Sequence, residues 1–263
     1  MNILQEIIAH KRDEIRRLAT SRESSIPARR PDPVRDLRAA LARPGMQVIA
    51  EIKRRSPSRG AIRPDLDPAE LARCYQGAGA AAISVLTDSH YFGGSLEQLQ
   101  TVRAAMDLPV LRKDFIIDPS QVYESAAAGA DAILLIADCL LEEELARLYE
   151  LARSLDLQVL VEGYSDASLA AISGLSPEIA GINSRNLETM EVDLDGMLPR
   201  RKLLPTGVIA VAESGIIDPA HLAAAARAGF KAALIGTALL IEGDPAANLR
   251  RLLAGRPQVE AAA

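Results

Sequence analysis

The chain has 263 residues and a formal net charge of −5 at pH 7, and 49% of its residues are hydrophobic and 25% charged. This composition is typical of a soluble globular protein, and the length fits one large α/β barrel or two ordinary domains. Basic residues are dispersed among acids, and no apolar run approaches the roughly 20 residues that span a bilayer, so we expect no nucleic acid and no membrane among its partners.

The first 45 residues predict a helical extension that packs on the rest of the chain. Apolar residues recur there at helical spacing, at Ile3, Leu4, Ile7, Ile8, Ile15 and Leu18. Charges interrupt this stretch, so we do not expect a signal peptide, and we expect a cytoplasmic protein. Residues 21–33 then predict a loop, and residues 34–42 a second short helix.

Three later stretches repeat one pattern: "YQGAGAAAISVLT", "ESAAAGADAILLIAD" and "AAARAGFKAALIGTA". Each reads as the end of a helix, a glycine turn and a short apolar strand. Gly79, Gly129 and Gly229 suit the left-handed residue that ends a helix. The strands show no alternation, which is typical of strands buried on both faces of a parallel sheet.

Eight segments of this kind predict strands, at residues 48–53, 81–87, 109–115, 132–137, 158–163, 179–183, 208–214 and 232–237. Helical patterns lie between them, at residues 68–76, 96–106, 120–128, 141–154, 166–173 and 218–228, and several begin with Asp-Pro, a signal for a first helical turn. The alternation predicts an α/β fold, a single (β/α)8 TIM barrel over residues 46–255 with a flexible tail at 256–263. A doubly wound open sheet is the less favoured alternative, because no G-x-G-x-x-G follows the first strand.

Polar residues interrupt these strands at the end where a TIM barrel holds its active site. They are Glu51, Lys53, Arg112, Lys113, Asp114, Glu162, Asn183 and Glu213, with Arg185 just after the sixth strand. Glu51 and Lys53 are two residues apart and therefore share a face of the first strand. Any one of these residues alone could be a solvated strand end or a structural ion pair. Unpaired buried charge is costly, so a cluster of this size indicates a site for chemistry.

Small residues at the last two strands predict a phosphate site. "AESGI" and "LIGTAL" let the backbone approach a ligand at Ser214, Gly215, Gly236 and Thr237, and Ser56 adds a donor from the first loop. Loops in these positions often bind phosphate through backbone N–H groups. Tight turns alone would also explain the glycines. His10, His90, His221 and the two cysteines, Cys74 and Cys139, show no metal-ligand spacing, so we expect no metal.

These patterns favour a phosphorylated small molecule as substrate, with proton transfers by Lys and Glu side chains. They leave open an isomerisation, an aldol cleavage or the condensation of a ring.

Several stretches together resemble one family: "VIAEIKRRSPSRG", "SVLTDSHYFGGSLEQL", "LPVLRKDFIIDPSQVYESAAAGADAILLI", "LVEGY", "GINSRNL" and "VAESGI". The chain is similar in this order, over nearly its whole length, to indole-3-glycerol-phosphate synthases. The resemblance implies one barrel with an N-terminal extension that helps to cover the site. It implies the closure and decarboxylation of 1-(2-carboxyphenylamino)-1-deoxyribulose 5-phosphate to indole-3-glycerol phosphate, in tryptophan biosynthesis and without a cofactor.

The resemblance also implies roles for single residues. Lys113 is the general acid that protonates the ribulose carbonyl, and Glu162 is the base or proton shuttle of the dehydration. Lys53 contacts the anthranilate carboxylate and assists acid catalysis. Glu51, Asn183 and Glu213 position these groups and the sugar hydroxyls, and Arg185 helps to set the electrostatic field near the substrate. The residues that bind the phosphate or the rest of the substrate are Ser56, Ser214, Gly215, Gly236 and Thr237.

The chain departs from the family pattern at Ala212, at Ser184 and after Glu162, where Gly163-Tyr164 replaces the frequent Val-His. None of these changes removes a proposed acid or base. Two rivals remain: another sugar-phosphate barrel enzyme, such as an isomerase or a Schiff-base aldolase using Lys53 or Lys113, and a non-catalytic barrel that binds a phosphorylated ligand. We expect a monomer or a weak homo-oligomer. Because Arg112 lies on the opposite face of its strand from Lys113, we expect Arg112→Met to be much milder than Lys113→Met.

Overall fold

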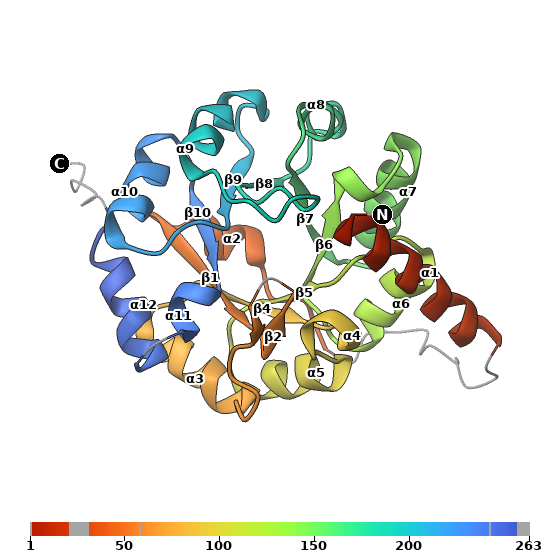
Figure 1. The fold of residues 1–263 in the computed structure, drawn as a ribbon, viewed down its shortest axis with the longest axis horizontal. Coiled ribbons are helices and arrows are strands. Elements are labelled where there is room, and N and C mark those ends of the chain that lie inside the picture. The colour runs from red at the N-terminus through yellow and green to blue at the C-terminus, as the bar shows by residue number, and fades with distance from the viewer. Residues whose placement is uncertain (1, 21–31, 58, 242, 257–263) are drawn as a thin grey trace.

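Eight parallel strands close into a barrel in the order β1-β10-β9-β8-β7-β6-β5-β4, which confirms the predicted (β/α)8 fold (Figure 1). The structure is a computed structural model that describes residues 2–20, 32–57, 59–241 and 243–256. The strands are β1 Gln47–Ile52, β4 Ala82–Leu86, β5 Val110–Lys113, β6 Ala132–Ile136, β7 Gln158–Gly163, β8 Ile179–Asn183, β9 Ile209–Glu213 and β10 Ala232–Ile235.

Helices surround the barrel on its outer side (Figure 1). They are α3 Pro68–Ala78, α5 Leu96–Ala105, α6 Pro119–Ala127, α7 Glu142–Ser154, α8 Asp166–Leu175, α10 Pro219–Arg227 and α12 Pro245–Leu253. As the Asp-Pro signals predict, an aspartate accepts a backbone N–H at the start of four of them, Asp67, Asp118, Asp218 and Asp244. None of the helices in the described ranges is both long and apolar enough to cross a bilayer.

Short elements in the connections were not predicted: the hairpin of β2 Arg55–Ser56 and β3 Gly60–Ala61, the helices α4 Ser89–Phe92, α9 Leu194–Met197 and α11 Thr237–Leu240, and the 3-10 turns η1 Ala137–Cys139 and η2 Leu198–Leu203. None is long enough to show a hydrophobic period. The last strand also ends earlier than residue 237, because Gly236 is already the N-cap of α11.

Two cores hold the barrel together. The outer core lies between the strands and the helices, and it includes the fully buried Tyr75 and Leu99. The inner core fills the barrel itself with aliphatic side chains such as Leu111, Leu134 and Leu160. Strand residues alternate between the two, as expected for a pleated strand, so the face of each polar residue follows from its place in the strand.

The N-terminal extension contributes a helix to each end of the barrel. At one end, α2 (Leu37–Ala42) buries Leu37 and Leu41 completely in the inner core, and Asp36 accepts a hydrogen bond of 2.8 Å from Gln158, the first residue of β7. The helix begins at Leu37 rather than at residue 34 because Asp36 caps it.

At the other end, α1 (Ile3–Thr20) lies at the rim beside α6, as Figure 1 shows. Ile7 and Ile8 of α1 join the inner core there, which confirms the predicted amphipathic helix. The expected loop at 21–33 lies outside the described residues up to residue 31, and so does the expected tail from residue 257 onward.

Candidate active site at the carboxyl ends of the strands

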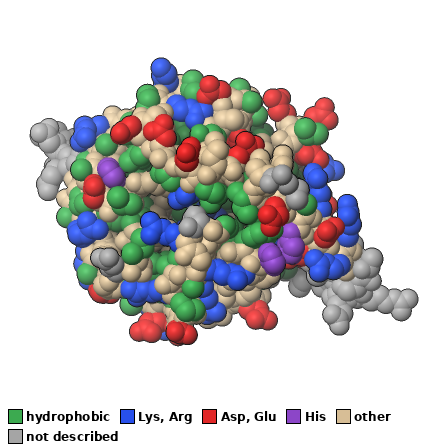
Figure 2. Space-filling model, in the orientation of Figure 1, with side chains coloured by type: hydrophobic (Ala, Val, Ile, Leu, Met, Phe, Trp, Pro, Cys, Tyr) green, Lys and Arg blue, Asp and Glu red, His purple; other side chains and the backbone are tan. Residues whose placement is uncertain are grey.

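A cavity of about 370 Å³ opens where the strands end, and the face in Figure 2 is hollowed at its centre. All twelve site residues that the sequence predicts line this cavity: Glu51, Lys53, Ser56, Lys113, Glu162, Asn183, Arg185, Glu213, Ser214, Gly215, Gly236 and Thr237. They come from strand ends, and from the loops just after them, that are far apart in the sequence, and closure of the barrel brings these ends together.

Lys113 ends β5, and its ammonium points into the barrel between two carboxylates. Its Nζ donates to Oε2 of Glu162 at 3.1 Å and lies 3.6 Å from Oε2 of Glu213. Asn183 donates from Nδ2 to the other oxygen of Glu162 at 2.8 Å. Glu162 is thereby fixed in orientation, with one oxygen on the amide and one on the ammonium.

The two carboxyls differ in charge although both are about 1% exposed. Burial raises the pKa of Glu162, but Lys113, Glu213 and Asn183 outweigh it, and the pKa lies below its ordinary value. Burial and the neighbouring Glu162 hold the pKa of Glu213 well above its ordinary value. Two negative charges this close repel each other, so the pair favours a proton on Glu213 and a carboxylate on Glu162.

The hydrogen bonding of the Glu213 carboxyl also favours its neutral form. Neither of its side-chain oxygens accepts a hydrogen bond from a residue in the described ranges. A proton on Glu213 lets it donate to Glu162 instead. Burial lowers the pKa of Lys113, but Glu162, Glu213 and Glu51 outweigh it, so the pKa is raised and the side chain is an ammonium.

Lys53 and Glu51 form a second acid and base pair, on the β1 side of the cavity. Their side chains meet at 2.5 Å between Nζ and Oε1, as the shared strand face predicts. Gly236 makes room for this pair, because a Cβ at that position would collide with the Glu51 carboxylate.

The predicted phosphate residues lie where β9 and β10 end. Ser214 and Gly215 have φ angles of 64° and 74°, the left-handed region that a non-glycine residue such as Ser214 rarely adopts. Gly236 is the N-cap of α11 and has no side chain with which to cap it. The turn and the helix start thus present backbone to the cavity, which is a common way to bind an anion.

Arg185 follows β8, and its guanidinium donates to the carbonyl of Met190 at 2.9 Å. Burial lowers its pKa, and so does the like charge of Arg59. Arg59 also lines the cavity but lies in the loop after β1, where nothing in the sequence distinguished it from the other arginines. An apolar wall, Leu86, Phe92, Phe115, Leu134, Ile136 and Leu187, was likewise not predicted as part of the site.

Gly181 is a further residue that the sequence did not indicate. It lies on β8 two residues before Asn183, and a Cβ there would collide with the carboxyl of Glu213. A glycine in the interior of a strand was the available signal, since it often marks a close approach.

Arg112 does face away from Lys113, but it is not a charge at the rim. It is 4% exposed, and its guanidinium donates to Thr87 (3.1 Å), Asp114 (3.0 Å) and Ser125 (2.9 Å). Arg112→Met would therefore leave buried polar groups without their partner, and it cannot serve as a mild control.

Metal ligands do not gather in this cavity: the part of the chain that the structure describes contains no group of three or more His, Cys, Asp or Glu residues able to hold a metal ion. Cys139 is partly buried and Cys74 is exposed, and neither is in a disulfide. The polar side chains that line the cavity are ammonium, guanidinium, carboxyl, amide and hydroxyl groups.

Comparisons with a family model and with known relatives all indicate the same family. The family described as indole-3-glycerol phosphate synthase matches residues 4–252. The chain is 46% identical over 251 residues to the indole-3-glycerol phosphate synthase of Parafrankia sp. (strain EAN1pec), covering 93% of this chain and 92% of that protein. The protein of the same name from Rhodopirellula baltica is 42% identical over 258 residues, which is 97% of this chain and 100% of that protein.

Among solved structures, thiamine phosphate pyrophosphorylase from Pyrococcus furiosus is similar with a TM-score of 0.61. The two sequences are 17% identical, and the match covers 84% of this chain and 97% of that one. This similarity concerns the barrel fold alone.

Proposed function

Because this chain belongs to the indole-3-glycerol phosphate synthase family, we propose that the cavity at the carboxyl ends of its strands carries out the ring closure of that family. The substrate is 1-(2-carboxyphenylamino)-1-deoxyribulose 5-phosphate. The aromatic carbon that bears the carboxylate attacks the ribulose carbonyl, carbon dioxide leaves that carbon, and loss of water completes the indole.

Lys113 is the general acid of the ring closure in this proposal. Its ammonium is inside the cavity and is kept protonated by the carboxylates around it. A carbonyl oxygen that becomes an alkoxide during the attack needs a proton, and a positioned acid typically contributes about 10²–10⁴-fold to such a step. Glu162 stabilises the ammonium from 3.1 Å, and the proton that Glu162 takes up as base in the dehydration can pass back to Lys113.

Glu162 is the base of the dehydration. Its pKa is lowered while that of Glu213 is raised, so the two carboxyls suit different tasks in one site. Asn183 holds Glu162 in orientation, and neutral Glu213 acts as a donor toward Glu162 or toward a sugar hydroxyl.

Lys53 pairs with the substrate carboxylate before it leaves as carbon dioxide. Glu51 positions the ammonium of Lys53 from 2.5 Å, and Arg185 adds positive charge to the same cavity. The apolar wall with Phe92 and Phe115 suits the anthranilate ring, which has no polar group on its faces.

The phosphate binds on the β9 and β10 side of the cavity. Backbone N–H groups at Ser214, Gly215, Gly236 and Thr237 and the hydroxyl of Ser56 are the donors in this proposal. The phosphate group then anchors the substrate away from the acid and base on β5 and β7.

One observation carries the proposal: the ammonium of Lys113 lies inside the cavity at 3.1 Å from the carboxyl of Glu162 and 3.6 Å from that of Glu213. The test is to incubate the purified protein with the substrate and to follow indole fluorescence and release of carbon dioxide. Borohydride reduction during turnover addresses the rival aldolase. A covalent adduct at Lys53 or Lys113 with no indole product would contradict the proposal.

We also propose that the enzyme is a cytoplasmic monomer or weak homo-oligomer that binds no nucleic acid and requires no cofactor. Residues 1–45 act as an extension of the catalytic barrel at 46–255, with a tail after it.

A further inference from the structure

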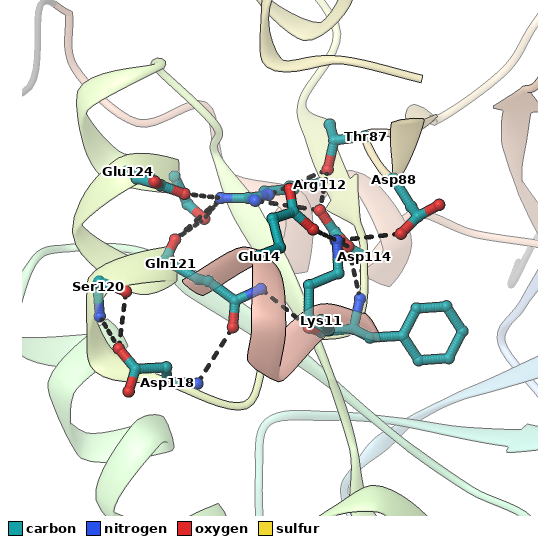
Figure 3. Close-up of polar contacts among 12 residues, drawn as sticks. Lys11, Glu14, Thr87, Asp88, Arg112, Asp114, Asp118, Ser120, Gln121 and Glu124 are labelled. Carbon is teal, nitrogen blue, oxygen red and sulfur yellow. Dashed lines mark hydrogen bonds and ion pairs between the residues drawn. The ribbon is translucent and has the colours of Figure 1, made fainter. Parts of the chain in front are cut away.

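We propose that Lys11 in the N-terminal helix is a positioning residue for Lys113, and that it acts through Asp114. Lys11 is 3% exposed, and its ammonium lies among three carboxylates (Figure 3): Glu14 of the same helix at 2.8 Å, Asp88 at 3.0 Å and Asp114 at 3.1 Å. The inference rests on the proposed function of Lys113 as the acid.

Asp114 directly follows Lys113, the last residue of β5, and it therefore connects the ion pairs of Lys11 to that strand. Four donors surround its carboxylate: Lys11 (3.1 Å) and the backbone N–H of Phe115 (2.8 Å) at Oδ1, and Thr87 (2.6 Å) and Arg112 (3.0 Å) at Oδ2. The position of Asp114 is thereby fixed by α1, by the end of β4 and by β5 itself.

Strand alternation makes this network a support for Lys113. Arg112 and Asp114, on either side of Lys113, are bonded to one another, while the side chain of Lys113 turns to the opposite side and donates to Glu162 inside the barrel; Asp114 also borders the cavity. Arg112 is in turn bonded to α6, through the carbonyl of Gln121 and the hydroxyl of Ser125, both at 2.9 Å. The backbone of Lys113 is thus held from both neighbouring residues, Arg112 and Asp114, whose contacts Figure 3 shows.

Charge balance shows why Lys11 is needed. Asp88 and Asp114 are both buried; the guanidinium of Arg112 donates to Asp114, and the ammonium of Lys11 is the cation beside Asp88. Lys11 is within 3.1 Å of both carboxylates. Its loss leaves one guanidinium for two buried carboxylates, so the ends of β4 and β5 must rearrange to admit water or a proton.

A rearrangement of this kind matters because the reach of Lys113 is set by short contacts. Its ammonium has to remain near Glu162 and near the substrate carbonyl at once, and a misplacement of about 1 Å can cost on the order of 10²-fold in rate. Four of the five proposed phosphate donors follow β9 and β10, across the barrel from Lys11 and Asp114, and only Ser56 follows β1, so binding should change much less than turnover.

The test is a double-mutant cycle with Lys11→Met and Lys113→Met. We expect Lys11→Met alone to lower kcat by on the order of 10- to 10²-fold with little change in KM. In the Lys113→Met background the same change should leave the residual kcat unaltered, because the group that Lys11 positions is gone. A structural role alone would lower kcat equally in both backgrounds.

Arg12→Met is the matched control, since Arg12 is the exposed neighbour in the same helix and also loses one positive charge. It should leave kcat unchanged. If Lys11→Met does not fold, Asp114→Asn keeps the size of the side chain and replaces it in the cycle, with the same expected pattern.

A wild-type kcat in Lys11→Met, or equal losses in both backgrounds, would overturn the inference while leaving the proposed function intact. Absence of indole product from the wild-type enzyme would overturn the proposed function itself.

Discussion

The ammonium of Lys113 lies between the carboxyls of Glu162 and Glu213. Its contribution to kcat can be distinguished by mutation from the effect of losing any one positive charge. Lys113→Met keeps the length and apolar stem of the side chain and removes the acid, so kcat should fall by about 10²–10⁴-fold with a smaller change in KM. Steady-state kinetics with a folded variant, verified by circular dichroism, measures this.

Lys231→Met is the control for that prediction. Lys231 is exposed and precedes β10 at the opposite end of the barrel, so the identical substitution is made far from the cavity. Its kcat should equal that of the wild type. Near-normal turnover in Lys113→Met would remove Lys113 from the role of acid.

Glu213 gives a pH dependence with a definite sign. Its pKa is raised, so the neutral form is present at low pH and is lost as the pH rises through that pKa. The new charge makes Lys113 a weaker acid, and kcat/KM should fall on the alkaline side. Glu213→Gln cannot ionise, and its pH profile should lack this fall. An alkaline limb that persists unchanged in Glu213→Gln would assign it to another group.

Asp114 has a lowered pKa, in contrast to Glu213, and its ionisation should therefore affect the stability of the protein at low pH. Burial raises its pKa, but Arg112 and Lys11 outweigh it and lower the pKa from 3.8 to about 2. The free energy of unfolding should therefore fall by about 2 kcal/mol as the pH drops from about 4 to about 2. Urea titrations across this range should show a smaller drop for Asp114→Asn. Equal drops in both proteins would mean that Asp114 is not held ionised by the network.

At the scale of an element, the same substitution should have opposite effects in a strand and in a helix. Gly181→Ala in β8 puts a methyl group where the Glu213 carboxyl lies, so kcat should fall by on the order of 10²-fold through displacement of that carboxyl. Gly77→Ala near the end of α3 meets no atom within 4 Å.

Gly77→Ala should stabilise the protein by about 0.5–1 kcal/mol with normal kcat, because alanine is the better helix former. Thermal unfolding and steady-state kinetics of the two variants measure both effects. Normal turnover in Gly181→Ala would show that Glu213 can move without consequence.

The barrel strands could be predicted because their signal is local. Each is a short apolar run after a glycine turn, and the three glycines chosen as helix ends, Gly79, Gly129 and Gly229, do have positive φ angles. The short elements of the loops, such as α4 and the β2–β3 hairpin, could not be predicted, because tertiary contacts hold them. The guanidinium of Arg55, for example, donates to the carbonyl of Ser89 at the start of α4.

Parts of the candidate site were predictable for a similar reason, since strand ends in a TIM barrel share one rim. Lys11 and Arg59 were not, because their place depends on how an outer helix and a loop return to that rim. The alternation of side chains along a strand predicted that Arg112 faces away from Lys113. It could not predict that Arg112 is buried, because the burial depends on contacts with α6.

All the acids and bases in the proposed mechanism are amino-acid side chains of this protein. Turnover should therefore survive exhaustive chelation, for example dialysis against EDTA followed by assay in metal-free buffer. Loss of activity that one divalent ion restores would require a different mechanism from that proposed for Lys113 and Glu162.

The two helices of the extension bear on how the protein is made. Residues 1–42 leave the ribosome before any strand does, yet α1 rests on the ends of β4 and β5 and α2 on the start of β7. Their docking must wait for segments synthesised later. Until those strands have been made, the apolar side chains of both helices, Ile7, Ile8, Leu37 and Leu41, have no core in which to be buried.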